Sequence, residues 1–246
     1  MKKTSLLIIL FIQSISIFSQ NQTNRVIYKV GLIESQSQEL KNQSDERKNF
    51  VSEVKENLSK LECELIFNNS CSVFKVIEKI NPNEDSFAYK KAKNFVNGLY
   101  YKNMQDSLKV TQVELSGKKY FVKKNIKEYN WLITNETKII DGYTCYKATC
   151  KFEEFDKLRS KQLIFTPEVW FTPSIPSSFG PKGLDGLPGL VLDGRFNDRI
   201  YFYATKIEFN VIVEKKSLTL DNKIPIISQE DYNKMLLEIN EKLKNE

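Results

Sequence analysis

Short segments in which apolar and polar residues alternate recur along most of this chain and set its fold class. In residues 24–33, for example, Val26, Tyr28 and Val30 alternate with Arg25 and Lys29. Such alternation is typical of strands with one buried face, and many short strands at regular spacing indicate an antiparallel sheet that curls or closes. Further candidate strands lie at 62–67, 72–80, 97–102, 107–116, 118–125, 129–134, 137–141, 143–152, 161–166, 190–193 and 200–213. We therefore predict a mainly β fold built on a strongly curved antiparallel sheet, open or half-barrel.

Two segments instead carry apolar residues at helical spacing. Phe50, Val54, Leu58 and Leu61 predict one amphipathic helix near the N-terminus, entered at Ser44 or Asp45. A second helix is predicted at the C-terminus, where Ser228 can cap a segment that carries Met235, Leu236 and Ile239. Residues 81–93, which include Pro82, read as a polar loop.

The first residues predict export. Lys2 and Lys3 precede an apolar run from Leu6 to Phe18, which is too short for a membrane span and resembles a signal peptide. We expect cleavage after Ser19; the alternative is an uncleaved anchor. No cysteine follows the run directly, so no lipid attachment is expected. The mature protein, residues 20–246, would be a single domain in the periplasm or secreted, without a lipid.

The chain has no histidine among its 246 residues. This absence excludes Ser-His-Asp and Cys-His relays and the usual zinc sites, so we expect no enzyme, no metal and no cofactor. A carboxylate-based enzyme is the remaining catalytic class, but the candidate acids read as turn and surface residues: Glu153, Glu154, Asp156, Asp185, Asp193 and Asp198. The basic and aromatic run at 118–124 reads as an ordinary strand, and we expect no nucleic-acid partner.

The four cysteines allow three disulfide pairings. If Cys145 and Cys150 share one strand, they lie roughly 16 Å apart, too far for a bridge. A tight turn at Asn68 and Asn69 would place Cys71 opposite Ile66 and leave Cys63 offset from it. The sequence leaves the pairing open, and it predicts that Cys145 faces the core.

Residues 168–193 hold four of the seven prolines and four of the nine glycines of the chain. Such density predicts a rigid, irregular backbone path. Leu187 to Leu190 suit a type II turn with positive φ at Gly189. Two interpretations are compatible here: a structural corner, or the rim of a ligand cavity formed by Trp170, Phe171, Phe179, Leu187, Pro188 and Gly189.

The same segment resembles a known family. Gly186, Leu187, Pro188, Gly189, Leu190 and Val191 are similar to the signature of the GLPGLI family of exported proteins from Bacteroidetes, with Val191 in place of isoleucine. Other family-like blocks are Thr137–Ala148 with Cys145, Trp170–Pro176, Phe179-Gly180-Pro181 and Leu65–Asn68. Ser174 stands where an acid is common, and Phe171 where tyrosine is common. The resemblance implies export and an architecture but no reaction.

The favoured function is a periplasmic binding or carrier module for an apolar ligand, held by a curved sheet. The alternative is an accessory protein that acts by contact with an outer-membrane transporter or another envelope partner. The identity of the ligand or partner and the oligomeric state do not follow from the sequence.

Overall fold

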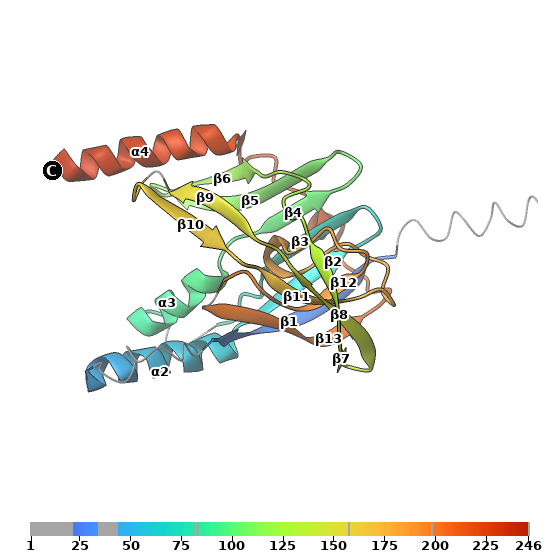
Figure 1. The fold of residues 1–246 in the computed structure, drawn as a ribbon. Helices are drawn as coiled ribbons and strands as arrows, with labels where there is room; N and C mark the ends of the chain where they lie inside the picture. Colours follow the sequence, from blue (N-terminus) through green and yellow to red (C-terminus); the bar gives the residue numbers. More distant parts are fainter. Residues whose placement is uncertain are drawn as a thin grey trace, which may run out of the picture.

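The computed structural model describes residues 22–33, 44–80, 82, 84–156, 158–197 and 199–245, and the predicted signal peptide lies outside them. The described part is mainly β, with three α-helices and two short 3-10 helices (Figure 1). The elements are β1 (Asn24–Leu32), α2 (Asp45–Lys60), β2 (Glu62–Phe67), β3 (Cys71–Val76), α3 (Phe87–Val96), β4 (Tyr100–Asn103), β5 (Leu108–Leu115), β6 (Lys118–Lys123), β7 (Leu132–Ile140), β8 (Tyr143–Thr149), β9 (Phe152–Asp156), β10 (Lys161–Phe165), β11 (Glu168–Thr172), η3 (Pro181–Gly183), β12 (Leu190–Arg195), β13 (Ile200–Glu208), η4 (Lys215–Leu218), β14 (Ile226–Ile227) and α4 (Gln229–Asn245).

Twelve strands form one sheet in the order β14-β6-β5-β4-β3-β2-β1-β13-β12-β11-β8-β7, and β9 and β10 form a separate hairpin. Neighbouring strands are antiparallel except β14, which pairs with β6 in parallel. The sheet is neither closed nor strongly curled, since β14 and β7 remain as its two edges. The predicted strongly curved antiparallel sheet, open or half-barrel, is thus wrong in its curvature and in one pairing, although the mainly β class is confirmed.

The central strand β1 shows why the sheet forms where it does. Val26, Tyr28 and Val30 are buried and alternate with half-buried residues, as the period of a strand requires. This face packs on α2 through Val54 and Leu58, in the largest cluster of buried apolar side chains. The first predicted strand is therefore confirmed, and it connects the two halves of the sheet by pairing with β2 and β13.

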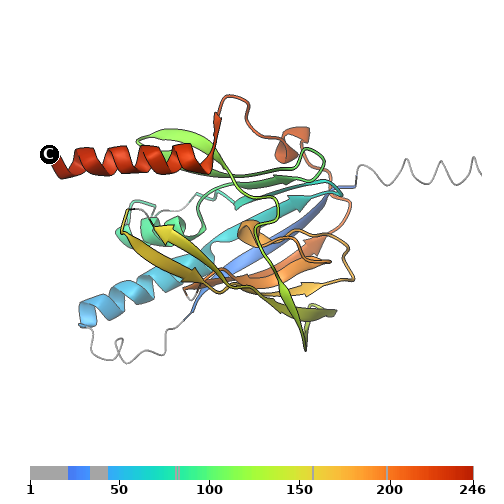
Figure 2. The ribbon, with the colours of Figure 1, turned by 45° about the horizontal axis from the view of Figure 1, so that its top comes forward.

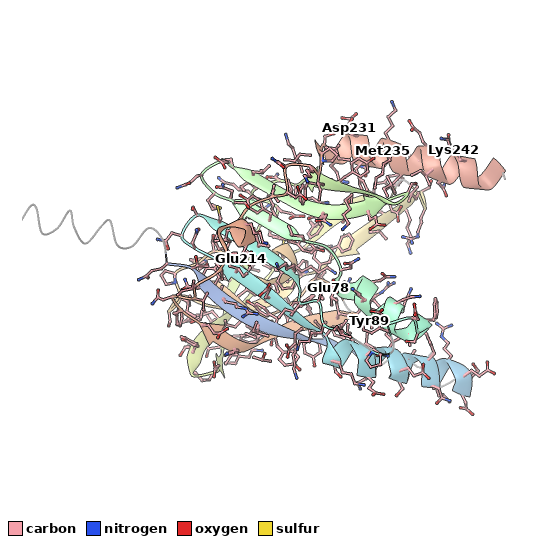
Figure 3. All side chains as sticks on the ribbon, turned by 180° about the vertical axis from the view of Figure 1, so that it is seen from behind. Glu78, Tyr89, Glu214, Asp231, Met235 and Lys242 are labelled. Carbon is pink, nitrogen blue, oxygen red and sulfur yellow. The ribbon has the colours of Figure 1, made fainter. Side chains whose placement is uncertain are left out.

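The two predicted helices are confirmed at their starts. Ser44 caps α2 by accepting a hydrogen bond from the backbone N–H of Arg47, and Ser228 does the same for Asp231 at the start of α4. Figure 3 shows α4 extending beyond the sheet, with Met235 and Lys242 along it. Among the described residues, no helix has the length and hydropathy of a membrane span.

The third helix, α3, was not predicted. Residues 87–96 fall partly in the segment assigned to a polar loop, yet Ala88, Tyr89, Ala92 and Val96 are buried at helical spacing. Ser86 accepts a hydrogen bond from the N–H of Tyr89 and caps the helix. The polar residues before it, at 81–86, hid this signal. Helix α3 lies beside α2 (Figure 1). Between them, Phe87 stacks on Phe50 with ring centroids 5.5 Å apart.

The four cysteines, all within the described residues, form no disulfide. The β2–β3 turn is wider than predicted: Ile66 pairs with Val73 and Cys63 with Val76, so Cys71 lies beyond the last pair. Cys145 is fully buried, which confirms that prediction, and Cys150 follows β8 rather than continuing it. Burial raises the pKa of the Cys63 thiol to about 12 and that of Cys145 to about 11.

These differences predict selective thiol chemistry. The thiolate is the reactive form, and Cys63, Cys145 and Cys150 are buried while Cys71 is partly exposed. At mildly alkaline pH a bulky disulfide reagent should label Cys71 quickly and the other three only after unfolding. The raised pKa values keep Cys63 and Cys145 protonated until the pH exceeds them. Mass spectrometry of the labelled peptides checks this, and fast labelling that persists in Cys71→Ser would contradict it.

Candidate functional site

The Pro- and Gly-rich segment forms the connection between β11 and β12 and is held closely by its own backbone. Leu190 donates its N–H to the carbonyl of Ile175 at 3.1 Å, and Gly186 donates to Ser178 at 2.8 Å. From the sheet, the buried Tyr28 hydroxyl donates to the Val191 carbonyl at 2.6 Å. We call residues 173–189 the strand-connecting loop. Its rigid, irregular path agrees with the sequence prediction.

Gly189 is not at positive φ, so the predicted type II turn with that conformation is wrong. A β-carbon on Gly189 would instead lie 2.3 Å from the carbonyl oxygen of Thr172. The glycine is needed because two backbone segments approach closely at this point. Positive φ values in this loop occur instead at Lys182, Gly183 and Gly186, at 53°, 76° and 95°.

A buried ion cluster fixes the same loop to the far half of the sheet. Asp185 is 5% exposed, and its carboxylate lies 2.6 Å from the ammonium of Lys102 on β4 and 3.0 Å from that of Lys109 on β5. Lys109 also lies 2.6 Å from the Glu128 carboxylate. The Trp131 indole donates to the Asp185 carbonyl at 2.8 Å. With two lysines and two carboxylates, the cluster balances its charge inside the protein.

Asp185 therefore differs from the surface acid that the sequence predicted. The other candidate acids are closer to prediction. Glu153, Glu154 and Asp156 lie on the β9–β10 hairpin, and Asp193 is partly exposed beside Lys138, 2.6 Å away. Asp198 lies outside the described residues. Because the Asp185 carboxylate is closed in by two ammonium groups, its arrangement serves to hold the loop.

Lys182 attaches the loop at another point. Its ammonium donates to the carbonyl of Phe95, the residue before the end of α3, at 2.7 Å. Desolvation by burial lowers the pKa of this lysine. The loop is thus bound to β4, β5 and α3 as well as to the strands that it connects.

A groove of about 750 Å³ lies along the strand-connecting loop. Its opposite walls come from the start of β1, the β2–β3 turn, the β4–β5 turn and the chain after β13. These segments lie at the end of the sheet away from α2 (Figure 2). The lining residues are Gln22, Asn24, Phe67, Asn68, Asn69, Met104, Tyr143, Ser174, Ile175, Pro176, Ser177, Ser178, Phe179, Leu187, Pro188, Gly189, Phe209 and Asn210.

The predicted cavity rim is brought together only in part. Phe179, Leu187, Pro188 and Gly189 line the groove. Trp170 and Phe171, which lie on β11, do not line the groove. Phe171 is 2% exposed and packs with Val191. Trp170 packs at the edge of the main core, with the Lys138 ammonium 4.5 Å from its ring centroid.

The remaining residues of the family-like motif are structural. Gly180 and Pro181 are buried within the loop, and a β-carbon on Gly180 would lie 2.2 Å from the Leu184 carbonyl oxygen. Leu190 and Val191 are fully buried in β12, and Cys145 is buried in β8. Gly186 lies at the turn described above.

Sequence reasoning missed the walls of the groove that face the loop. Its amide residues come from three separate places in the chain: Gln22 and Asn24, Asn68 and Asn69, and Asn210. Single asparagines near turns are common, and only the strand order 2-1-13 brings these turns to one end of the sheet. No local pattern could have identified them.

Comparisons with known proteins give one partial family match and a similarity of fold. Residues 152–193 match the model of a family described as "Protein of unknown function (Porph_ging)". That range runs from β9 into β12 and includes the strand-connecting loop, although it is less than half of the chain. The curated proteins give no match.

Two crystal forms of PNGF-II superpose with TM-scores of 0.56 and 0.53, at 17% and 18% identity, and cover 88% of this chain. The chain spans about a third of the length of PNGF-II, 33% and 34% in the two forms. LprF from Mycobacterium bovis superposes with a TM-score of 0.27 at 10% identity, over 81% of this chain and 90% of LprF. By fold, then, the chain is similar to one part of PNGF-II, and residues 152–193 are similar to a family of unknown function.

Proposed function

We propose that this protein is a binding module of the cell envelope whose ligand occupies the groove beside the strand-connecting loop. The observation that carries the proposal is the groove itself. Its volume of about 750 Å³ falls in the range of small-molecule sites. One wall is a loop held by the buried Asp185 ion cluster, so the site is largely formed before a ligand arrives. The N-terminal signal supports an address outside the inner membrane, as a periplasmic or secreted protein.

Binding is better supported than catalysis. Among the described lining residues there is no Asp, Glu, Lys, Arg or Cys, and Tyr143 is the titratable group that remains. General acid–base chemistry near neutral pH needs a group of another kind at the substrate. We therefore propose a non-enzymatic role for the groove.

The sequence favoured a carrier for an apolar ligand. Phe179, Leu187 and Pro188 give the groove one apolar wall, which suits an apolar part of a ligand. The facing walls carry asparagine, glutamine and serine side chains, and desolvation of those amides by an acyl chain would cost free energy. A wholly apolar ligand is therefore supported less well than a ligand with hydrogen-bonding groups.

Ser174→Trp tests the groove directly. Ser174 is exposed on the groove wall, and its backbone, not its side chain, bonds to Thr172. The indole should occupy part of the groove and weaken ligand binding about tenfold or more, while thermal unfolding stays unchanged. NMR titrations with neutral oligosaccharides, a fatty acid and an uncharged peptide measure the binding. Ser52→Trp, an exposed site on α2, is the matched control.

Absence of binding by all three probe classes would overturn the proposal. Equal binding by Ser174→Trp and the wild type would show that the ligand binds at another place on the protein. Native mass spectrometry of the protein from its host adds a further readout, because it separates a small bound ligand from a bound protein.

A contact role with an envelope partner is the second candidate, supported by the free edge strand β7. Leu132, Ile133 and Ile139 on this strand are 68%, 47% and 67% exposed. An unpaired edge with apolar side chains is a surface on which another strand can add. A co-purifying protein, with no small ligand, would favour this candidate over the groove.

A further inference from the structure

The groove is uncharged in a chain that is rich in charge. Charged residues make up 28% of the sequence, yet none of the described residues that line the groove is charged. A site for an anion would show lysine or arginine, and a site for a cation would show carboxylates. The lining thus favours a neutral ligand.

Two amide groups of the groove, those of Asn24 and Asn68, are oriented as donors. The Oδ1 atom of Asn68 accepts from the N–H groups of Ser70 at 2.9 Å and Cys71 at 2.8 Å. The Oδ1 atom of Asn24 accepts from the N–H of Asn210 at 3.2 Å. Because the oxygens are used by the backbone, each Nδ2 is left to donate, and neither has a partner within the described residues. These donors suit hydroxyl, ether or carbonyl oxygens.

Aromatic and apolar faces lie in the same lining. Phe209 is 48% exposed and Met104 is 45% exposed, while Tyr143 is half-buried. Partly exposed rings beside amide donors form a surface that is apolar in the middle and hydrogen-bonding around it. A pyranose ring has matching chemistry, with C–H groups on its faces and oxygens around its rim.

An extended peptide fits less well. Peptides that add to a sheet need a free strand edge for their backbone. The free edges of the large sheet belong to β14 and β7, and neither strand contributes a residue to the described lining. The groove is built from turns and strand ends, which offer side chains and no backbone ladder.

From these observations we infer that the groove binds a neutral carbohydrate, with the Asn24 and Asn68 amides donating to its oxygens and Phe209 packing on a ring face. This inference rests on the proposed function and specifies its ligand class. The donors are fixed by turns that the backbone itself holds, so they are in place before binding.

Two variants separate a carbohydrate site from a merely structural one. Asn68→Asp keeps the Oδ1 acceptor that holds the β2–β3 turn and replaces the donor by a negative oxygen. Phe209→Ala removes the packing face. Their matched controls are Asn125→Asp, an exposed asparagine whose Oδ1 accepts from Lys127 in a similar turn, and Phe155→Ala, 55% exposed on β9. Neither control residue lines the groove.

The experiment is a glycan array with neutral and anionic oligosaccharides, followed by calorimetry on the best neutral glycan, a fatty acid and an uncharged peptide. We expect neutral glycans to bind, and Asn68→Asp and Phe209→Ala each to weaken that binding about tenfold, with the controls within about twofold. Preferred binding of anionic glycans, of the fatty acid or of the peptide would overturn the inferred ligand class. The proposal that the protein is a binding module would still hold. Neutral binding that neither variant weakens would overturn the assigned residues. Binding of no probe would overturn both proposals.

Discussion

Asp185→Asn should destabilise this protein by about 3–5 kcal/mol, the cost of leaving buried charges without a partner. Asparagine has nearly the same shape, so packing is conserved and the change is one of charge. The ammonium of Lys102, 4% exposed, would keep only neutral partners, among them the carbonyl of Ile126 at 3.1 Å. Lys109 would keep the Glu128 carboxylate. Urea unfolding followed by circular dichroism measures the loss.

A second substitution should restore much of that stability. Lys102→Met together with Asp185→Asn removes one positive and one negative charge and leaves the pair of Lys109 and Glu128 intact. We expect the double variant to be more stable than Asp185→Asn alone, with a coupling free energy of about 1–3 kcal/mol. Glu214→Gln, an exposed acid, is the control and should change stability by less than about 0.5 kcal/mol. A double variant no better than the single one would contradict the ion cluster.

Gly189→Ala should destabilise by about 3 kcal/mol, at the upper end of the range for overpacking. The added β-carbon would meet three backbone atoms, the carbonyl oxygen and carbon of Thr172 at 2.3 and 2.5 Å and the nitrogen of Pro173 at 2.8 Å. Thr172 is fully buried, so its backbone has little room to move. The groove wall beside Gly189 would shift as a result.

The comparison that isolates this effect is Gly142→Ala. Gly142 has a φ of +78° and nothing within 4 Å of its β-carbon position, so only backbone strain applies, about 1 kcal/mol. Thermal unfolding of the two variants should therefore differ clearly. Equal losses would show that Gly189 is required for conformation and not for close approach.

The elements that the sequence predicts well are those with local signals. The alternation in β1 and the serine caps of α2 and α4 act over a few residues, so reading them needs no knowledge of the fold. Helix α3 had the same kind of signal in Ser86 and Ala88 to Val96, but polar residues before it masked the period. The segment forms a helix because its buried residues pack against α2.

The features that could not be predicted depend on contacts between residues that are far apart in the sequence. In the sequence, Asp185 resembles an ordinary acid in a turn. Its two lysine partners come from β4 and β5, and Lys102 is 83 residues away from it along the chain. Gly189 looks like the corner of a Pro-Gly turn until Thr172 is found against it. The groove needs turns from β1, β2 and β13 at the same end of the sheet. Each of these follows from topology, which local residue patterns do not encode.

The fixing of the strand-connecting loop to β4 and β5 has a consequence for how the molecule opens. In the sheet, β4 and β12 are separated by β3, β2, β1 and β13, and a sheet of this width could lose strands from either side separately. The contacts of Asp185 and Lys182 link the two sides directly, so neither hairpin can detach without breaking the other's contacts. Amide hydrogen exchange in β4–β5 and in β11–β12 should then occur through one shared opening, with similar protection on both sides of the sheet.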